Sequence, residues 1–175
     1  MKTLILIIIA IVGVLALVVA VVALVGSKLP VQHTASHSIV VHQSPQQVYD
    51  VIRDFASAPS WRSDLKSVEV ENQLNGKIHF RENSSQGTVN YELVEDIPAQ
   101  RMVTRILDTD LGYSGKWTYA FTPEAGGTRV TITEDGEVSN VIFRFMSRYV
   151  FGHTATMDSY LTSLGKKFGE DVKPS

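Results

Sequence analysis

Residues 38–49, Ser-Ile-Val-Val-His-Gln-Ser-Pro-Gln-Gln-Val-Tyr, decide the fold because two periodicities meet within them. In the first half of this stretch apolar and polar residues alternate, which is typical of a half-buried β-strand. Ser44 is a good helix N-cap, Pro45 suits the first helical position, and Gln47 completes a capping box with Ser44. The stretch therefore predicts a strand that leads directly into a helix.

The residues that follow predict one short helix and then a meander of strands. The helix carries a single apolar stripe that includes Val48, Ile52 and Phe55, and Ala58-Pro59 ends the pattern. Six segments with strand character come next, separated by turn residues, at 68–72, 78–81, 88–94, 102–107, 116–122 and 128–134. Their apolar residues alternate in phase, so we expect an antiparallel sheet with one dry and one wet face.

The C-terminal residues supply a cover for the dry face. Apolar residues keep helical spacing from Ile142 to Val150, and the stripe resumes after Gly152 and runs to Phe168. We expect one long helix, or two helices with a bend at Gly152, because glycine destabilises a helix interior. The fold class is therefore α+β, with a sheet of about seven strands and a long C-terminal helix.

The N-terminal residues form an apolar run, since Leu4 to Val25 contains no charged or polar side chain. As a helix this run would be about 33 Å long, enough to cross a hydrocarbon core of about 30 Å. A cleavable signal peptide is the alternative, but its apolar core spans only about 7 to 15 residues. We expect one uncleaved transmembrane helix, with Leu4 to Val25 as the membrane contact.

The flanks of the apolar run bear on its orientation and on the division of the chain. Lys2 favours an internal N-terminus and hence an exported domain, although Lys28 lies on the other flank. Pro30 prevents the anchor helix from simply continuing into the domain. The expected units are an anchor at 1–26, a linker at 27–34, a single domain at 35–170 and a tail at 171–175.

Composition excludes several classes of function. The chain has no cysteine, which excludes disulfides, thiolate chemistry and cysteine-ligated metal sites. Its formal net charge of −2 does not favour binding to nucleic acid, which requires an excess of basic residues. We expect no metal site, because His33 and His37 lie in the tether region and His42 on the wet face. We expect no cofactor and assign no catalytic residue, since the sequence shows no nucleophile elbow, phosphate loop or HExxH pattern.

The order of these elements resembles the helix-grip fold of the START, birch-pollen-allergen and polyketide-cyclase-like proteins, the SRPBCC superfamily. The resemblance rests on residues 44–49, on Pro59-Ser60-Trp61, on residues 127–131 at the start of the last strand, and on the amphipathic final helix. It implies a curved antiparallel sheet around the C-terminal helix, with an apolar cavity between them. Members bind sterols, phospholipids and other apolar ligands, and some cyclise or dehydrate polyketides. The superfamily has no shared catalytic motif to transfer.

Inner-face residues are the candidates for contact with a ligand. Glu82 and Glu134 fall in phase with the dry face near strand ends, either as solvated rim carboxylates or as carboxylates of raised pKa at a pocket mouth. His153 either packs or points at the cavity. Aromatic residues on this face serve as core or as cavity wall. The candidates are Trp61, Phe80, Glu82, Tyr91, Trp117, Tyr119, Glu134, His153, Met157 and Tyr160.

These observations predict a membrane-tethered domain that binds or transports an apolar or amphipathic small molecule, such as a lipid or an isoprenoid-like compound. A tether would keep the domain at high effective concentration beside the bilayer. Residues 141–151 are apolar on more than one face and include Arg144 and Arg148. We expect this segment either to pack on the sheet, to close the cavity or to touch lipid headgroups.

Two alternatives come from other classes. A polyketide cyclase or dehydratase-like enzyme would bring Glu82, Tyr91, Glu134 and His153 together within hydrogen-bond reach. A structural or assembly protein would fill the dry face completely with the side chains of Trp117, Phe121, Tyr160 and Phe168.

Overall fold

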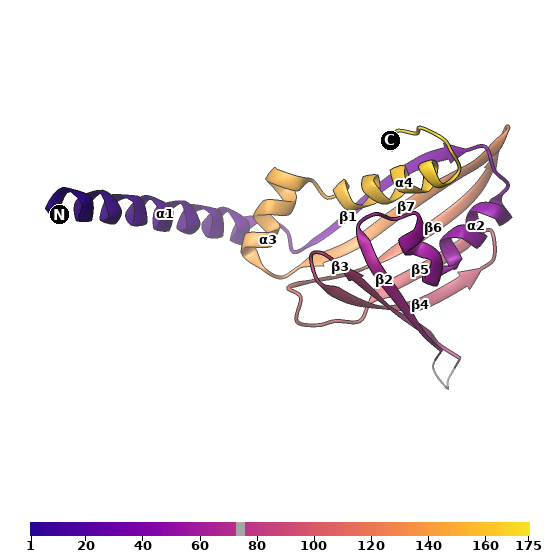
Figure 1. The fold of residues 1–175 in the computed structure, drawn as a ribbon, viewed down its shortest axis with the longest axis horizontal. Coiled ribbons are helices and arrows are strands. Elements are labelled where there is room, and N and C mark those ends of the chain that lie inside the picture. The colour runs from indigo at the N-terminus through magenta and orange to yellow at the C-terminus, as the bar shows by residue number, and fades with distance from the viewer. Residues whose placement is uncertain (73–75) are drawn as a thin grey trace.

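The computed structural model describes residues 1–72 and 76–175. Its elements follow in the order α1 (Lys2–Lys28), β1 (Gln32–Val41), α2 (Pro45–Arg53), the 3₁₀ helix η1 (Phe55–Ser60), β2 (Leu65–Asn72), β3 (Ile78–Ser84), β4 (Thr88–Ile97), β5 (Arg101–Ile106), β6 (Tyr113–Glu124), β7 (Gly127–Val138), α3 (Val141–Met146), the π-helix η2 (Ser147–Phe151) and α4 (Ala155–Lys167). Helix α1 projects away from the curved sheet (Figure 1).

The seven strands form one antiparallel sheet in the order β1-β7-β6-β5-β4-β3-β2, which confirms the predicted architecture. The predicted capping box is present at the start of α2, where the Ser44 side chain accepts a hydrogen bond from the Gln47 backbone N–H. The predicted Asn75-Gly76 turn falls partly on residue 75, which lies outside the described residues. The alternation of apolar residues and the capping box therefore predicted the order of the strands and the start of α2 correctly.

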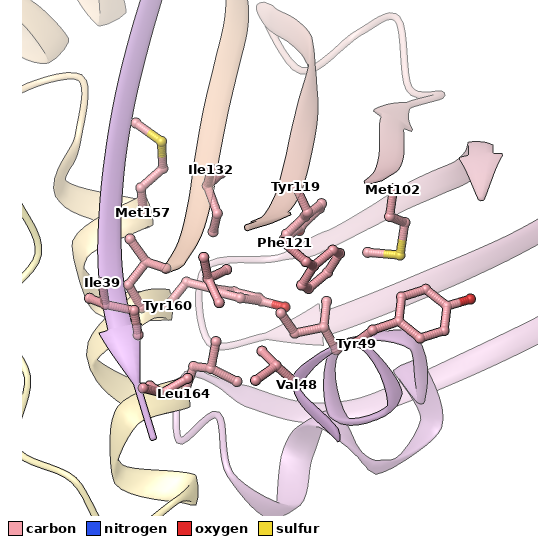
Figure 2. Close-up of a cluster of buried hydrophobic side chains, with 14 of the residues drawn as sticks. Ile39, Val48, Tyr49, Met102, Tyr119, Phe121, Ile132, Met157, Tyr160 and Leu164 are labelled. Carbon is pink, nitrogen blue, oxygen red and sulfur yellow. The ribbon is translucent and has the colours of Figure 1, made fainter. Parts of the chain in front are cut away.

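The core lies between the sheet and the helices α2 and α4. Met157, Leu161 and Leu164 of α4 are fully buried against strand residues such as Val130 and Ile132. Figure 2 shows side chains from α2, α4 and the strands pointing into this common space. Burial of large apolar side chains here provides most of the driving force for folding.

The junction between α1 and the sheet is shorter than expected. Residues 32–34, predicted to belong to a linker, are the first residues of β1 and pair with residues 135–137 of β7. The prediction was wrong here because these polar residues carry no apolar alternation, and the strand is held by backbone pairing with β7 instead. His33 and His37, expected in the tether region, consequently lie on β1.

Of the two predicted alternatives, one long C-terminal helix or two helices with a bend at Gly152, the structure has the interrupted form, and its first half is placed differently from the prediction. Gly152 has a φ of +79°, a conformation that suits glycine, and it ends the π-helix before α4 begins. Helix α4 covers the sheet as predicted. Helix α3, in contrast, has no buried residue and packs beside the end of α1. The prediction that its stripe covers the dry face was therefore wrong, because an apolar stripe does not specify which apolar partner it meets.

Candidate ligand site between the sheet and helix α4

Tyr160 lies at the centre of the candidate site and is presented by the buried face of α4 (Figure 2). Its ring meets three predicted site residues edge-on or tilted, with centroid distances of 5.3 Å to Trp61, 5.7 Å to Trp117 and 5.8 Å to Tyr119. Aromatic pairs favour such offset or edge-on arrangements. The structure thus brings one residue from the turn after η1, two from β6 and one from α4 into a single cluster.

Arg62 provides a positive charge inside this cluster. Its Nη1 donates to Glu82 Oε1 at 2.6 Å, and its Nη2 donates to Asp64 Oδ2 at 2.7 Å. The guanidinium also lies over the Tyr160 ring, 5.1 Å from the centroid. The side chains of Arg62 and Glu82 are only 11% and 15% exposed. Glu82 is therefore a buried, paired carboxylate and not a solvated one at the rim.

Sequence reasoning missed Arg62, which immediately follows the expected site residue Trp61. It lies in an irregular segment after η1, where the backbone N–H of Arg62 donates to the Ala58 carbonyl. A signal was nevertheless available, because a carboxylate such as Glu82 on a dry face requires a cationic or hydrogen-bonding partner. Arg62 and Glu82 are twenty residues apart in the sequence, so local spacing does not indicate that they pair.

The titration properties of the cluster follow from its burial. Burial raises the pKa of the Glu82 carboxyl, and the Arg62 charge offsets part of that shift. Burial also raises the pKa of the hydroxyls of Tyr91, Tyr119 and Tyr160, and the negative charge of Glu82 adds to the shift in each case. The three tyrosines therefore stay protonated near neutral pH and can act as hydrogen-bond donors.

Phe80 and Tyr91, two further expected residues, extend the cluster along β3 and β4. The Phe80 ring stacks on Tyr91 with centroids 5.0 Å apart and on Phe55 of η1 at 4.0 Å. Met157, the remaining expected residue of α4, is fully buried in the core beneath the same sheet face. Eight of the ten predicted residues thus belong to this cluster or to the core around it.

Glu134 and His153 meet in a second cluster, near the end of the sheet where β1 begins. Glu134 Oε2 accepts from Trp117 Nε1 at 2.6 Å, and Glu134 Oε1 lies 2.9 Å from His33 Nε2. The His33 ring stacks on His153 with centroids 4.1 Å apart. Burial lowers the pKa of His153, and His33 and Arg148 lower it further. Glu82 and Tyr91 therefore lie in the first cluster and Glu134 and His153 in the second, and Trp117 connects the two because its ring also contacts Tyr160.

Side-chain packing occupies the space between the sheet and α4. Two open surface grooves among the described residues have volumes of about 350 and 260 Å³, and neither is lined by a residue of α4. Phe121 and Tyr160 are buried, while Trp117 and Phe168 are partly buried against the same core. Within residues 1–72 and 76–175, no group of three or more metal-ligating side chains could hold a metal ion.

A curved seven-stranded antiparallel sheet that grips a C-terminal helix defines a START-like helix-grip protein. The chain belongs to the family described as polyketide cyclase / dehydrase and lipid transport, whose model matches residues 32–167. No curated protein sequence gives a significant match.

Solved structures of low sequence identity share the fold. A START superfamily protein from Mycobacterium smegmatis has a TM-score of 0.63 at 15% identity, covering 78% of this chain and 97% of its own. The Zhui aromatase/cyclase from Streptomyces has a TM-score of 0.62 at 11% identity, covering 79% and 94%. Norcoclaurine synthase from Thalictrum flavum has a TM-score of 0.63 at 11% identity, covering 80% and 88%. At these identities the likeness concerns the fold alone.

Proposed function

We propose that this protein is a membrane-anchored domain that binds an apolar or amphipathic small molecule between the sheet and α4. The observation that carries the proposal is the buried ion pair of Arg62 and Glu82 among aromatic rings. Well-packed apolar residues would stabilise such a position as well or better, so a buried ion pair is weak evidence for a role in stability. A role in orienting a ligand would account for its position at the inner face.

The residues around the ion pair suit the two ends of an amphipathic ligand. Trp61, Trp117 and Tyr160 offer apolar ring faces to a hydrocarbon or ring body. The Arg62 guanidinium and the protonated tyrosine hydroxyls donate hydrogen bonds, so they favour a polar end rich in acceptors, such as a carboxylate, carbonyl or hydroxyl. Because the rings pack on one another in this structure, binding would require some of them to turn aside.

Membrane anchoring is supported by α1. By length and composition, Lys2–Lys28 is a helix that could cross a membrane. The family description includes lipid transport, and a lipid carrier benefits from a tether because its ligand then leaves the bilayer close by. We propose that α1 spans the membrane once and that the ligand is a lipid or isoprenoid-like compound.

An enzymatic function is the second candidate, and the environment of Glu82 favours it. Burial raises the pKa of this carboxyl, as general acids in apolar sites require, and the tyrosines that can donate hydrogen bonds lie in the same cluster. Similar structures include an aromatase/cyclase and norcoclaurine synthase. If Glu82 transfers a proton to a bound substrate, Glu82→Gln will retain ligand binding and lose turnover.

Tryptophan fluorescence tests the binding proposal directly, because the chain has only two tryptophans and both rings contact Tyr160. The full chain in phospholipid nanodiscs would be titrated with oleate and with farnesol, against empty nanodiscs. We expect a saturable emission change with at least one probe, weakened about tenfold or more in Arg62→Met/Glu82→Gln.

The matched control is Arg101→Met, which removes an arginine from an exposed ion pair with Glu95. It should titrate like the unaltered chain. If neither probe changes the emission, ligand binding at this site is refuted, and a filled core with a structural or assembly role becomes the better interpretation.

A further inference from the structure

Residues 141–151, here called the α3–η2 segment, expose large apolar side chains next to α1. None of these eleven residues is buried. Four of them, Phe143, Tyr149, Val150 and Phe151, range from 46% to 65% exposed. Single exposed apolar residues are ordinary, but several within so short a segment indicate an interaction surface.

The segment is held against the C-terminal end of α1. A Cβ placed on Gly26 would lie 2.0 Å from the Val141 carbonyl oxygen, so the two helices approach at a distance that only glycine permits. Arg144 Nη1 donates to the Leu29 carbonyl at 3.1 Å and ties α3 to the end of α1. Figure 1 shows α3 running across the end of α1 and not alongside its length.

This contact sets the depth of the segment relative to a bilayer. The apolar run of α1 ends at Val25, and its length of about 33 Å already matches a hydrocarbon core of about 30 Å. Gly26 would therefore lie at the boundary between acyl chains and headgroups. Because α3 touches Gly26 and runs across the axis of α1, the α3–η2 segment would lie in the plane of that boundary.

The chemistry of the segment suits this position. Interfacial helices combine apolar and aromatic side chains with basic residues, which contact headgroups. The segment presents Tyr149, Val150 and Phe151 together with Arg148, and Lys28 lies on the adjoining last turn of α1. Near a membrane surface each basic residue also favours anionic lipids.

We infer that the α3–η2 segment is a second membrane-contact surface, seated in the headgroup region of the bilayer that α1 spans. The inference rests on the proposed anchoring by α1. A single helical tether would leave the domain free to tilt, whereas two contacts hold it in one orientation. The segment also leads through Gly152 into α4, which carries Tyr160, so the same contact positions the ligand-site helix relative to the bilayer.

Site-specific fluorescence in the full chain tests this inference, helped by the absence of native cysteines. Val150→Cys would be labelled with an environment-sensitive fluorophore and reconstituted in phosphatidylcholine–phosphatidylglycerol vesicles containing nitroxide lipids. Leu15→Cys, in the middle of α1, reports anchoring. Val94→Cys is the matched control, because Val94 of β4 is 50% exposed but belongs to the far part of the sheet. Phe151→Cys provides a second position in the segment.

We expect the Leu15 label to be quenched best by nitroxides deep in the acyl chains. The Val150 and Phe151 labels should be quenched severalfold more than the Val94 label, and best by nitroxides near the headgroups. If Leu15 is quenched while Val150 and Phe151 behave like Val94, the second contact is refuted and anchoring stands. If Leu15 is not quenched, the anchoring proposal fails and the inference fails with it. A blue-shifted but unquenched Val150 label would indicate that the segment packs against protein, in the same chain or in a second copy, and would also refute the inference.

Discussion

Replacing Arg62 by methionine should cost about 3 to 4 kcal/mol of unfolding free energy near pH 7. The substitution retains much of the side-chain volume but removes the cation that pairs with Glu82. Breaking a buried ion pair by removing one partner typically costs about 3 to 5 kcal/mol. Asp64 adds little, because its side chain is about half exposed, and the loss of the contact between the cation and the Tyr160 ring falls within the same range.

Protonation of Glu82 limits this loss and makes it depend on pH. Near pH 7, holding a carboxyl neutral costs about 3.7 kcal/mol when its unfolded pKa is about 4.3, at about 1.36 kcal/mol per pKa unit. Without Arg62, the burial that already raises the pKa of Glu82 is unopposed. The folded state then binds more protons than the unfolded state, so stability falls as the pH rises above about 4.3. At about pH 5, the part of the lost unfolding free energy that comes from keeping Glu82 neutral should fall to about 1 kcal/mol.

Urea unfolding of the full chain in a mild detergent, followed by the emission of Trp61 and Trp117, would measure these values. Arg62→Met/Glu82→Gln should regain most of the lost stability and the pH dependence of the deficit should disappear, because no buried charge remains. Arg101→Met should change the stability by no more than about 0.5 kcal/mol, since its ion pair is exposed. A deficit of less than about 1 kcal/mol for Arg62→Met, or one that stays equal at both pH values, would refute the reasoning.

The remaining predictions concern the second cluster and the contact between α1 and α3. Glu134→Ala should cost about 1 to 3 kcal/mol in urea unfolding and shift tryptophan emission, because the Trp117 Nε1–H loses its acceptor; an unshifted spectrum would contradict this. Because burial lowers the pKa of His153, its neutral form stabilises the fold above about pH 6.5, and stability should fall as the pH drops below that value. His153→Gln should reduce this slope in unfolding titrations, and an unchanged slope would assign it to other groups. Gly26→Ala should accelerate hydrogen exchange in α3, whereas Gly13→Ala, with open space around its Cβ, should not; equal exchange in both variants would count against the close contact.

Local chemistry explains why most of the fold could be predicted. The capping box at Ser44 and the in-phase alternation of the strands each depend on residues close together in sequence, and the structure confirms the sheet that they imply. Of the two alternatives for the C-terminal residues, one long helix or two helices with a bend at Gly152, the structure has the second, and Gly152 adopts a positive φ there. The short strand segment at 32–34 escaped prediction because its backbone pairing with β7 needs no apolar pattern.

The candidate site was predictable only in part. Alternation placed Glu82 and Glu134 on the inner face, because a strand's side chains share a face at every second residue. Their partners Arg62 and His33 were not predicted, since the first lies in an irregular segment and the second is 101 residues from Glu134. The spacing of residues along one strand predicts which face a carboxylate is on, but not which distant side chain pairs with that carboxylate.

The sequence by itself determined the order of the strands and helices and the inner face of the sheet, because capping, periodicity and hydropathy act between residues a few positions apart. It also determined the membrane-length apolar run from Leu4 to Val25. Only the tertiary structure decided that Glu82 pairs with Arg62, that Tyr160 gathers the aromatic rings, and that α3 leaves the sheet to pack at Gly26. The physical reason is that burial is non-directional: an apolar stripe or an inward-facing carboxylate requires a partner, and chain topology chooses which one.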